Sequence, residues 1–161
     1  MGTPLVPIIM GSKSDLDHGR KIALALETFG IDSEIRVASA HKAAVYCLDL
    51  LNHYESLDRP KVFVTIAGRS NALSGLVDAH VASPSIACPP SSSSFGGADI
   101  FSSLRMPSGV APAVVLDAGN TALLAAKIFA LQFPDIAKKV HEAQAGHRNK
   151  VIESDRDLNG A

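Results

Sequence analysis

Three segments of the chain with the character of β-strands each end in a turn of small and polar residues, after which a helical pattern begins. The strand segments are 5–10, 33–37 and 61–66, and the turns are 10–15, 39–42 and 67–71. In a parallel α/β sheet, the carboxyl ends of the strands meet helix N-termini at one edge, and ligands bind there. Such N-termini carry unpaired backbone N–H groups that attract anions. The pattern therefore predicts a small phosphate-bearing ligand at this edge.

The remaining sequence continues the alternation of strands and helices. We expect strands at 5–10, 33–37, 61–66, 85–88 and 112–116, helices at 15–29, 42–55, 71–81, 120–132 and 135–152, and a loop with a short helix at 89–106. Alternation implies parallel pairing and right-handed crossovers, so the fold class is α/β, a three-layer α/β/α sandwich. No repeat or linker divides the chain. We expect a single domain over 1–161, with its core at about 5–132 and a C-terminal helix at about 135–152.

Charge and cysteine content exclude several classes of function. The net charge of −1 comes with no basic run, which disfavours nucleic acid as a partner. The two cysteines, Cys47 and Cys88, are far apart and have no metal-type spacing, so they indicate buried residues of a reducing compartment. The N-terminal apolar run is too short for a signal peptide or a membrane span. We expect a cytoplasmic protein without a membrane partner.

Two stretches do not fit a simple monomer. Residues 122–131 are apolar almost all round, and Lys127 is their only charge. A surface helix has a polar face, so this helix is expected to be covered on both sides, by the final helix or by another subunit. Residues 89–97 (PPSSSSFGG) are a flexible-type segment at a strand end, typical either of a lid or of a plain connection.

His41 is the candidate for proton transfer. It follows a predicted strand, whereas the other histidines fall on predicted helices. Histidine changes charge near neutral pH and so suits this chemistry. The neighbouring Lys42 can pair with a phosphate or be a solvated lysine at a helix start. Arg69 can bind an anion or a neighbouring carboxylate, and Cys88 has no cation or base beside it in the sequence.

The first turn alone is ambiguous. Ser12, Ser14 and Asp15 can cap the following helix and do nothing else. Neither a Walker motif nor a G-x-G-x-x-G pattern is present there. The two further turns of the same kind favour a ligand site.

The chain resembles the PurE family of purine biosynthesis from residue 10 to about 131. The resemblance rests on several motifs in order: MGSKSD at 10–15, SAHK at 39–42, IAG at 66–68, MPSG at 106–109 and the helix at 120–130. It implies a flavodoxin-like parallel sheet and a homo-oligomer, usually an octamer, with active sites at subunit contacts. Such contacts would explain the apolar stretch at 122–131.

The departures within these motifs indicate which of two chemistries applies. Mutases of the family move a carboxylate from the exocyclic nitrogen to C4 of the aminoimidazole ring, and they have an arginine where this chain has Lys42. Residues 67–75 (AGRSNALSG) lack the mutases' second histidine and Leu-Pro. The segments ACPP at 87–90 and SSLR at 102–105 resemble the class II enzymes, which carboxylate 5-aminoimidazole ribonucleotide with carbon dioxide. The mutase is the alternative.

The resemblance also implies roles for the turn residues. His41 would be the base that removes the proton from C4, and no ATP, metal, biotin or other cofactor would be needed. Lys42 would contact the phosphate, and Asp15 would bind ribose hydroxyls or cap the helix. The expected substrate-binding set is Gly11, Ser12, Ser14, Asp15, Ser39, Ala40, Lys42, Gly68, Arg69, Ser70 and Asn71.

Two flavodoxin-like classes without this activity fit less well. A receiver domain needs acidic residues after the first strand and an aspartate after the third, where this chain has Gly11-Ser12 and Gly68-Arg69-Ser70. A flavin-binding module would need aromatic residues in these turns, and there are none.

Overall fold

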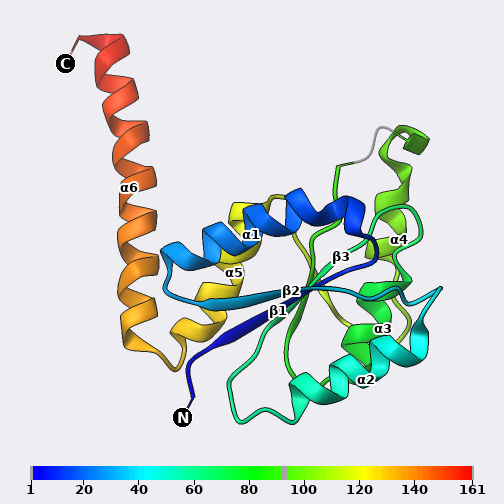
Figure 1. Ribbon diagram of the computed structural model, residues 1–161. Coiled ribbons are helices and arrows are strands. Elements are labelled where there is room, and N and C mark those ends of the chain that lie inside the picture. Colours follow the sequence, from blue (N-terminus) through cyan, green and yellow to red (C-terminus); the bar gives the residue numbers. More distant parts are fainter. Residues whose placement is uncertain (1, 92–93, 161) are drawn as a thin grey trace.

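The computed structural model describes residues 2–91 and 94–160. Five strands form one parallel sheet in the order β2-β1-β3-β4-β5 (Figure 1). The strands are β1 (Leu5–Met10), β2 (Asp32–Val37), β3 (Phe63–Ile66), β4 (Ser85–Ala87) and β5 (Ala113–Val114). The helices are η1 (Lys13–Asp15), α1 (Leu16–Thr28), α2 (Ala44–Glu55), α3 (Ala72–His80), η2 (Ser94–Ile100), α4 (Phe101–Leu104), α5 (Ala118–Ala130) and α6 (Pro134–Asn159). This is the expected flavodoxin-like α/β fold.

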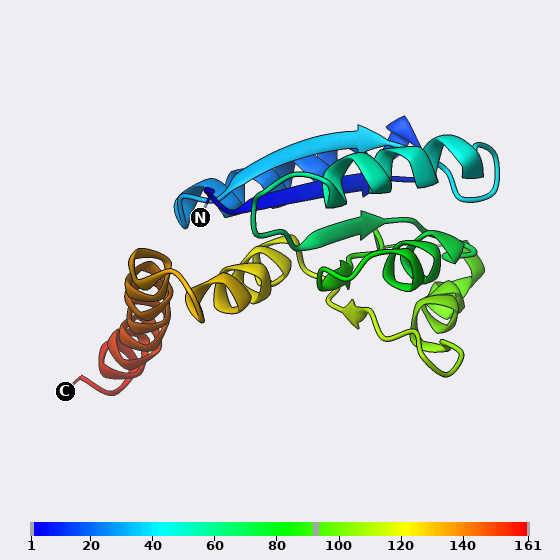
Figure 2. The same ribbon diagram turned by 90° about the horizontal axis from the view of Figure 1, so that it is seen from below.

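Helices cover both faces of the sheet, which explains why β1 and β3 are buried along their whole length (Figure 2). Ile8 of β1 packs in a cluster with residues of α1, α5 and the start of α6. Its neighbour Ile9 points to the other face and packs with residues of α2 and α3. Consecutive strand residues therefore feed two separate cores, as the period of a β-strand requires. The three-layer α/β/α arrangement is confirmed.

A buried tyrosine joins β2 to α2. The hydroxyl of Tyr54 donates a hydrogen bond to Glu34 Oε2 at 2.7 Å, and Arg36 Nη1 donates to the tyrosine oxygen at 3.4 Å. Burial, reinforced by the bond to Glu34, raises the pKa of Tyr54 to about 12, so the hydroxyl remains a neutral donor at physiological pH. This contact fixes α2 against β2 and thereby the turn between them, which holds residues 38–43.

The apolar stretch at 122–131 is covered only in part within the chain. In α5, Ala122, Ala125 and Phe129 are buried in the cluster that also contains residues of α1, α6 and the sheet. The final helix, α6, therefore packs on this stretch, which is one of the two alternatives expected from the sequence. Leu131, just after α5, is 85% exposed.

Several element bounds differ from the sequence-based expectation. The C-terminal helix runs to Asn159 rather than 152, and Gly160 ends it in the left-handed conformation with φ 66°. The added residues are mostly charged, so hydrophobic periodicity does not detect them. The expected strand at 112–116 shortens to β5, and the expected helix at 42–55 begins only at Ala44, which leaves Lys42 in a turn.

The C-terminal half of α6 stands clear of the other elements (Figure 1). Only Ile136 and Val140 of this helix are buried, both near its start. Across the described ranges, no helix, α6 included, combines the length and apolarity needed to cross a membrane. Of the segment expected at 89–97 to be a lid or a connection, residues 92–93 lie outside the described residues, and η2 begins at Ser94.

Candidate active site

The strand order creates a switch point between β1 and β3. The chain leaves β1 for β2 on one side and later adds β3 on the other. Ligands of flavodoxin-like sheets bind at the carboxyl edge beside such a point. A cavity of about 760 Å³ lies there, within the size range of small-molecule sites. Every predicted site residue except Asn71 lines it: Gly11, Ser12, Ser14, Asp15, Ser39, Ala40, His41, Lys42, Gly68, Arg69 and Ser70.

The turn after β1 combines capping with a carboxyl group at the cavity. Ser12 Oγ accepts hydrogen bonds from the Ser14 amide at 3.2 Å and from the Ser14 hydroxyl at 2.8 Å, so Ser12 caps η1. Asp15 makes no capping bond to α1. Burial raises the pKa of Asp15, although a bond from Ser14 and the nearby His18 act in the opposite direction. Asp15 is therefore a partly buried acceptor at the cavity wall.

The turn after β2 presents His41 and Lys42. Ser39 shapes this turn, because its Oγ accepts the Lys42 amide at 3.3 Å and its carbonyl accepts the Ala43 amide at 2.9 Å. Both His41 and Lys42 are exposed. Among the described residues, neither side chain has a protein hydrogen-bond partner, so both are available to a ligand.

The turn after β3 contains a residue in an uncommon conformation. Arg69 has φ 59°, in the left-handed region that side-chain-bearing residues rarely adopt. Gly68, Arg69 and Ser70 line the cavity, whereas Asn71 is only 3% exposed. Asn71 Oδ1 caps α3 by accepting the Ser74 amide at 3.1 Å, and its Nδ2 donates to Ser103 Oγ at 2.8 Å. Asn71 therefore supports the turn from behind the cavity.

Sequence reasoning missed four lining residues, Ala67, Leu73, Pro90 and Ser91. Pro90 and Ser91 follow β4 at the same edge as the three predicted turns, so the rule on strand ends also applied to them. Leu73 lies in the first turn of α3, where nothing in the sequence distinguishes it from a core residue.

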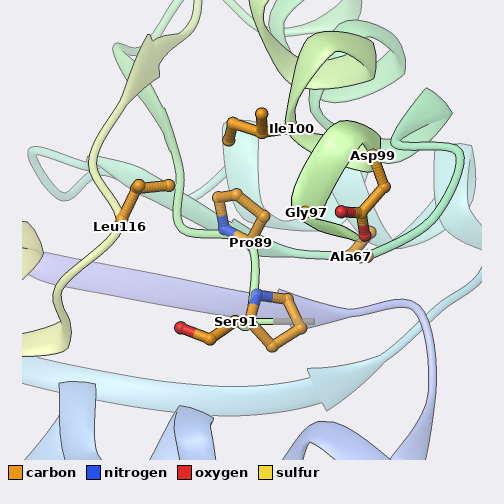
Figure 3. Close-up of a pocket in the computed structure, with 9 residues that line it drawn as sticks. Ala67, Pro89, Ser91, Gly97, Asp99, Ile100 and Leu116 are labelled. Carbon is orange, nitrogen blue, oxygen red and sulfur yellow. The ribbon is translucent and has the colours of Figure 1, made fainter. Parts of the chain in front are cut away.

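A second cavity of about 270 Å³ adjoins the first (Figure 3). Ala67, Gly68, Pro90 and Ser91 line both. Its other walls are mainly apolar and come from Pro89, Gly97, Asp99, Ile100 and Leu116. Such walls suit a small neutral molecule better than an anion. An anion would lose its hydration there and gain few hydrogen bonds in exchange.

The side chains of His18 in α1 and Cys88 after β4 are in contact. His18 Nε2 lies 3.2 Å from Cys88 Sγ, which corrects the expectation that this cysteine has no base nearby. Burial raises the pKa of the Cys88 thiol, against a smaller opposing effect of Thr121. The thiol is fully buried, so the pair joins α1 to the end of β4 and does not form a nucleophile. Residues 2–91 and 94–160 contain no group of three or more His, Cys, Asp or Glu side chains arranged to hold a metal ion.

Together, this fold and site define a flavodoxin-like protein with a cavity of small-molecule size, lined by an exposed histidine, at the carboxyl edge of its sheet. The comparisons with known proteins make the class specific. The family model described as AIR carboxylase matches residues 5–150. The chain belongs to the AIR carboxylase (PurE) family.

Relatives and solved structures agree with this assignment. The chain is 57% identical over 155 residues to a phosphoribosylaminoimidazole carboxylase of Treponema denticola, covering 96% of this chain and 98% of that protein. It is similar to the crystal structure of Treponema denticola PurE, with a TM-score of 0.95 over 96% of this chain and 98% of that chain. A human bifunctional phosphoribosylaminoimidazole carboxylase/phosphoribosylaminoimidazole succinocarboxamide synthetase is 45% identical over 126 residues, which are 78% of this chain and 30% of that protein.

Proposed function

We propose that this protein carboxylates 5-aminoimidazole ribonucleotide at C4 with carbon dioxide, giving 4-carboxy-5-aminoimidazole ribonucleotide in purine biosynthesis. The observation that carries the proposal is a single cavity that both the turn with His41 and Lys42 and the turn at Gly68–Ser70 line. The names of the relatives support the same reaction.

The proposed chemistry needs only a positioned base. The ring amino group pushes electron density onto C4, whose electron pair attacks the carbon of carbon dioxide, and one C=O π pair moves to oxygen as the carboxylate forms. C4 then holds both its hydrogen and the new carboxylate. His41 takes that proton, the ring regains aromaticity, and the imidazolium returns the proton to solvent. ATP, metal and biotin have no step to perform, because the substrate ring already activates C4.

The cavity supplies the remaining binding groups. Lys42 pairs with the phosphate, and Asp15 accepts hydrogen bonds from ribose hydroxyls. Gly68, Arg69 and Ser70 contact the ring and carbon dioxide, and Gly11, Ser12, Ser14, Ser39 and Ala40 complete the wall. The proposed substrate set no longer includes Asn71, because both ends of its side-chain amide are bound within the protein.

A direct assay with two substrates tests the activity. We expect turnover of 5-aminoimidazole ribonucleotide that rises with dissolved carbon dioxide and does not require ATP. The N-carboxylated nucleotide should be a poor substrate, because residues 67–75 lack the mutases' second histidine. Efficient conversion of the N-carboxylated compound without added carbon dioxide would instead assign the chain to the mutases.

We also propose that the protein works as a homo-oligomer, an octamer as is usual in its family. Exposed apolar side chains at Leu131, Val151 and Leu158 lie on or beside α5 and α6 and would be covered in such an assembly. Light scattering at micromolar concentration should give a mass several times 16.8 kDa. A stable monomer would contradict the proposal.

The proposed location is the cytoplasm, where thiols remain reduced. Cys47 and Cys88 are both free and buried, which is compatible with this environment.

A further inference from the structure

The backbone at Arg69 is held in a conformation that its own side chain disfavours. Arg69 is the only non-glycine residue with positive φ in the described part of the chain, at 59°. A left-handed conformation brings Cβ close to the following carbonyl oxygen, so it persists only where neighbouring groups enforce it. The groups that enforce it here lie about thirty residues later in the sequence.

Asp99 and Ser102 bind the backbone on both sides of this residue. Asp99 Oδ2 accepts the Arg69 amide at 3.0 Å. The Ser102 hydroxyl donates to the Arg69 carbonyl at 3.0 Å, and its oxygen accepts the Asn71 amide at 3.0 Å. The same hydroxyl hydrogen is shared with the Asp99 carbonyl at 2.8 Å, which joins the two residues into one unit. The turn is therefore clamped by η2 and α4.

The Arg69 turn lines the larger cavity, whereas Asp99 and Ser102, the two residues that clamp it, do not. Gly68, Arg69 and Ser70 line that cavity, whereas Asp99 lines the smaller cavity on the other side and Ser102 lines neither. Figure 3 shows the Asp99 carboxylate beside Ala67, where the turn begins. A Cβ atom on Gly68 would lie 3.8 Å from Asp99 Oδ2, so the carboxylate packs directly against the turn.

We propose that Asp99 and Ser102 are positioning residues, which hold the Arg69 turn in the left-handed shape that the nucleotide ring and carbon dioxide require. The inference rests on the proposed function, because it assigns the turn to the substrate. Both residues act through the backbone of Arg69.

The first experiment compares two replacements of Asp99. Asp99→Ala removes the acceptor of the Arg69 amide, and we expect kcat/KM for 5-aminoimidazole ribonucleotide to fall by about tenfold or more, since small misplacements at a reacting centre are costly. Asp99→Asn keeps an acceptor oxygen and should restore kcat/KM to within about threefold of the wild type. Asp58→Ala is the matched control, because Asp58 is exposed on the connection before β3, at the opposite edge of the sheet.

The second experiment asks whether the bonds from Asp99 and Ser102 offset the steric cost of the left-handed conformation at residue 69. Arg69→Ala and Arg69→Gly both remove the side chain, but glycine adopts positive φ without steric cost. Adding Asp99→Ala should therefore reduce kcat/KM much more in the Arg69→Ala background than in the Arg69→Gly background. Equal losses would overturn the proposed coupling. Ser102→Ala should follow the same pattern.

The outcomes separate a positioning role from a structural or electrostatic one. If Asp99→Ala matches Asp58→Ala in kcat/KM, or if its whole loss is a lower fraction of folded protein by circular dichroism, the proposal fails. If Asp99→Asn is as defective as Asp99→Ala, charge matters and the hydrogen bond does not, and it fails again. If the wild type does not carboxylate the nucleotide, the proposed function fails instead. A crystal structure of Asp99→Ala then still tests the positioning role. Loss of the positive φ at residue 69 would support it, and a retained positive φ would overturn it.

Discussion

Replacing His41 with asparagine should lower the turnover of 5-aminoimidazole ribonucleotide by about 100- to 10,000-fold, the range typical of general acid–base groups. The structure indicates that this substitution should affect proton transfer and leave the fold unchanged. His41 is exposed on the turn between β2 and α2, and its side chain has no protein hydrogen-bond partner among the described residues. Asparagine fills similar space but cannot accept and release a proton near neutral pH. Fold and nucleotide affinity should therefore stay near those of the wild type.

Steady-state kinetics, circular dichroism and a nucleotide-binding titration together check this prediction. His141→Asn is a suitable control, because His141 is exposed on α6 and does not line the cavity. Turnover of His41→Asn within a few-fold of this control would move the proton-transfer role to another group. A loss explained wholly by weaker nucleotide binding would make His41 a binding residue.

The sheet and three of the four cavity turns follow from local signals in the sequence. Apolar runs such as 5–10 have the length and composition of strands buried on both faces, and the polar turns after them mark one edge. Because parallel pairing brings all carboxyl ends to that edge, His41 and Gly68 could be placed near each other without knowing a single contact between them. The prediction required only the order of elements.

The parts that sequence reasoning did not find depend on contacts between distant residues. Asn71 follows β3 like Gly68 and Arg69, but its side-chain amide is bound to Ser103 and to the start of α3, and it does not line the cavity. The left-handed turn at Arg69 depends on Asp99, which a local pattern cannot assign to it. The end of α6 was missed for a different reason, because an exposed charged helix carries no apolar periodicity to detect.

Replacing Lys42 with alanine should weaken the affinity for 5-aminoimidazole ribonucleotide by about 10- to 150-fold. This range corresponds to the roughly 1.5–3 kcal/mol that a hydrogen bond to a charged group contributes. Lys42 lines the cavity on the same turn as His41, and no carboxylate forms an ion pair with it among the described residues. Its ammonium group is therefore available to the substrate phosphate as a point charge.

A lysine close by in the fold provides the matched control. Lys13 is exposed on η1 between Ser12 and Ser14, which both line the cavity, but Lys13 does not. Lys13→Ala removes the same charge from the same rim and should change the affinity by less than about threefold, since exposed charges that make no direct contact are screened by salt. Affinities for the nucleotide, measured by isothermal titration at two salt concentrations, check both variants. Similar losses of affinity in Lys42→Ala and Lys13→Ala would mean that the phosphate is attracted by the overall electrostatic potential of the cavity. Lys42 would then make no direct contact with it.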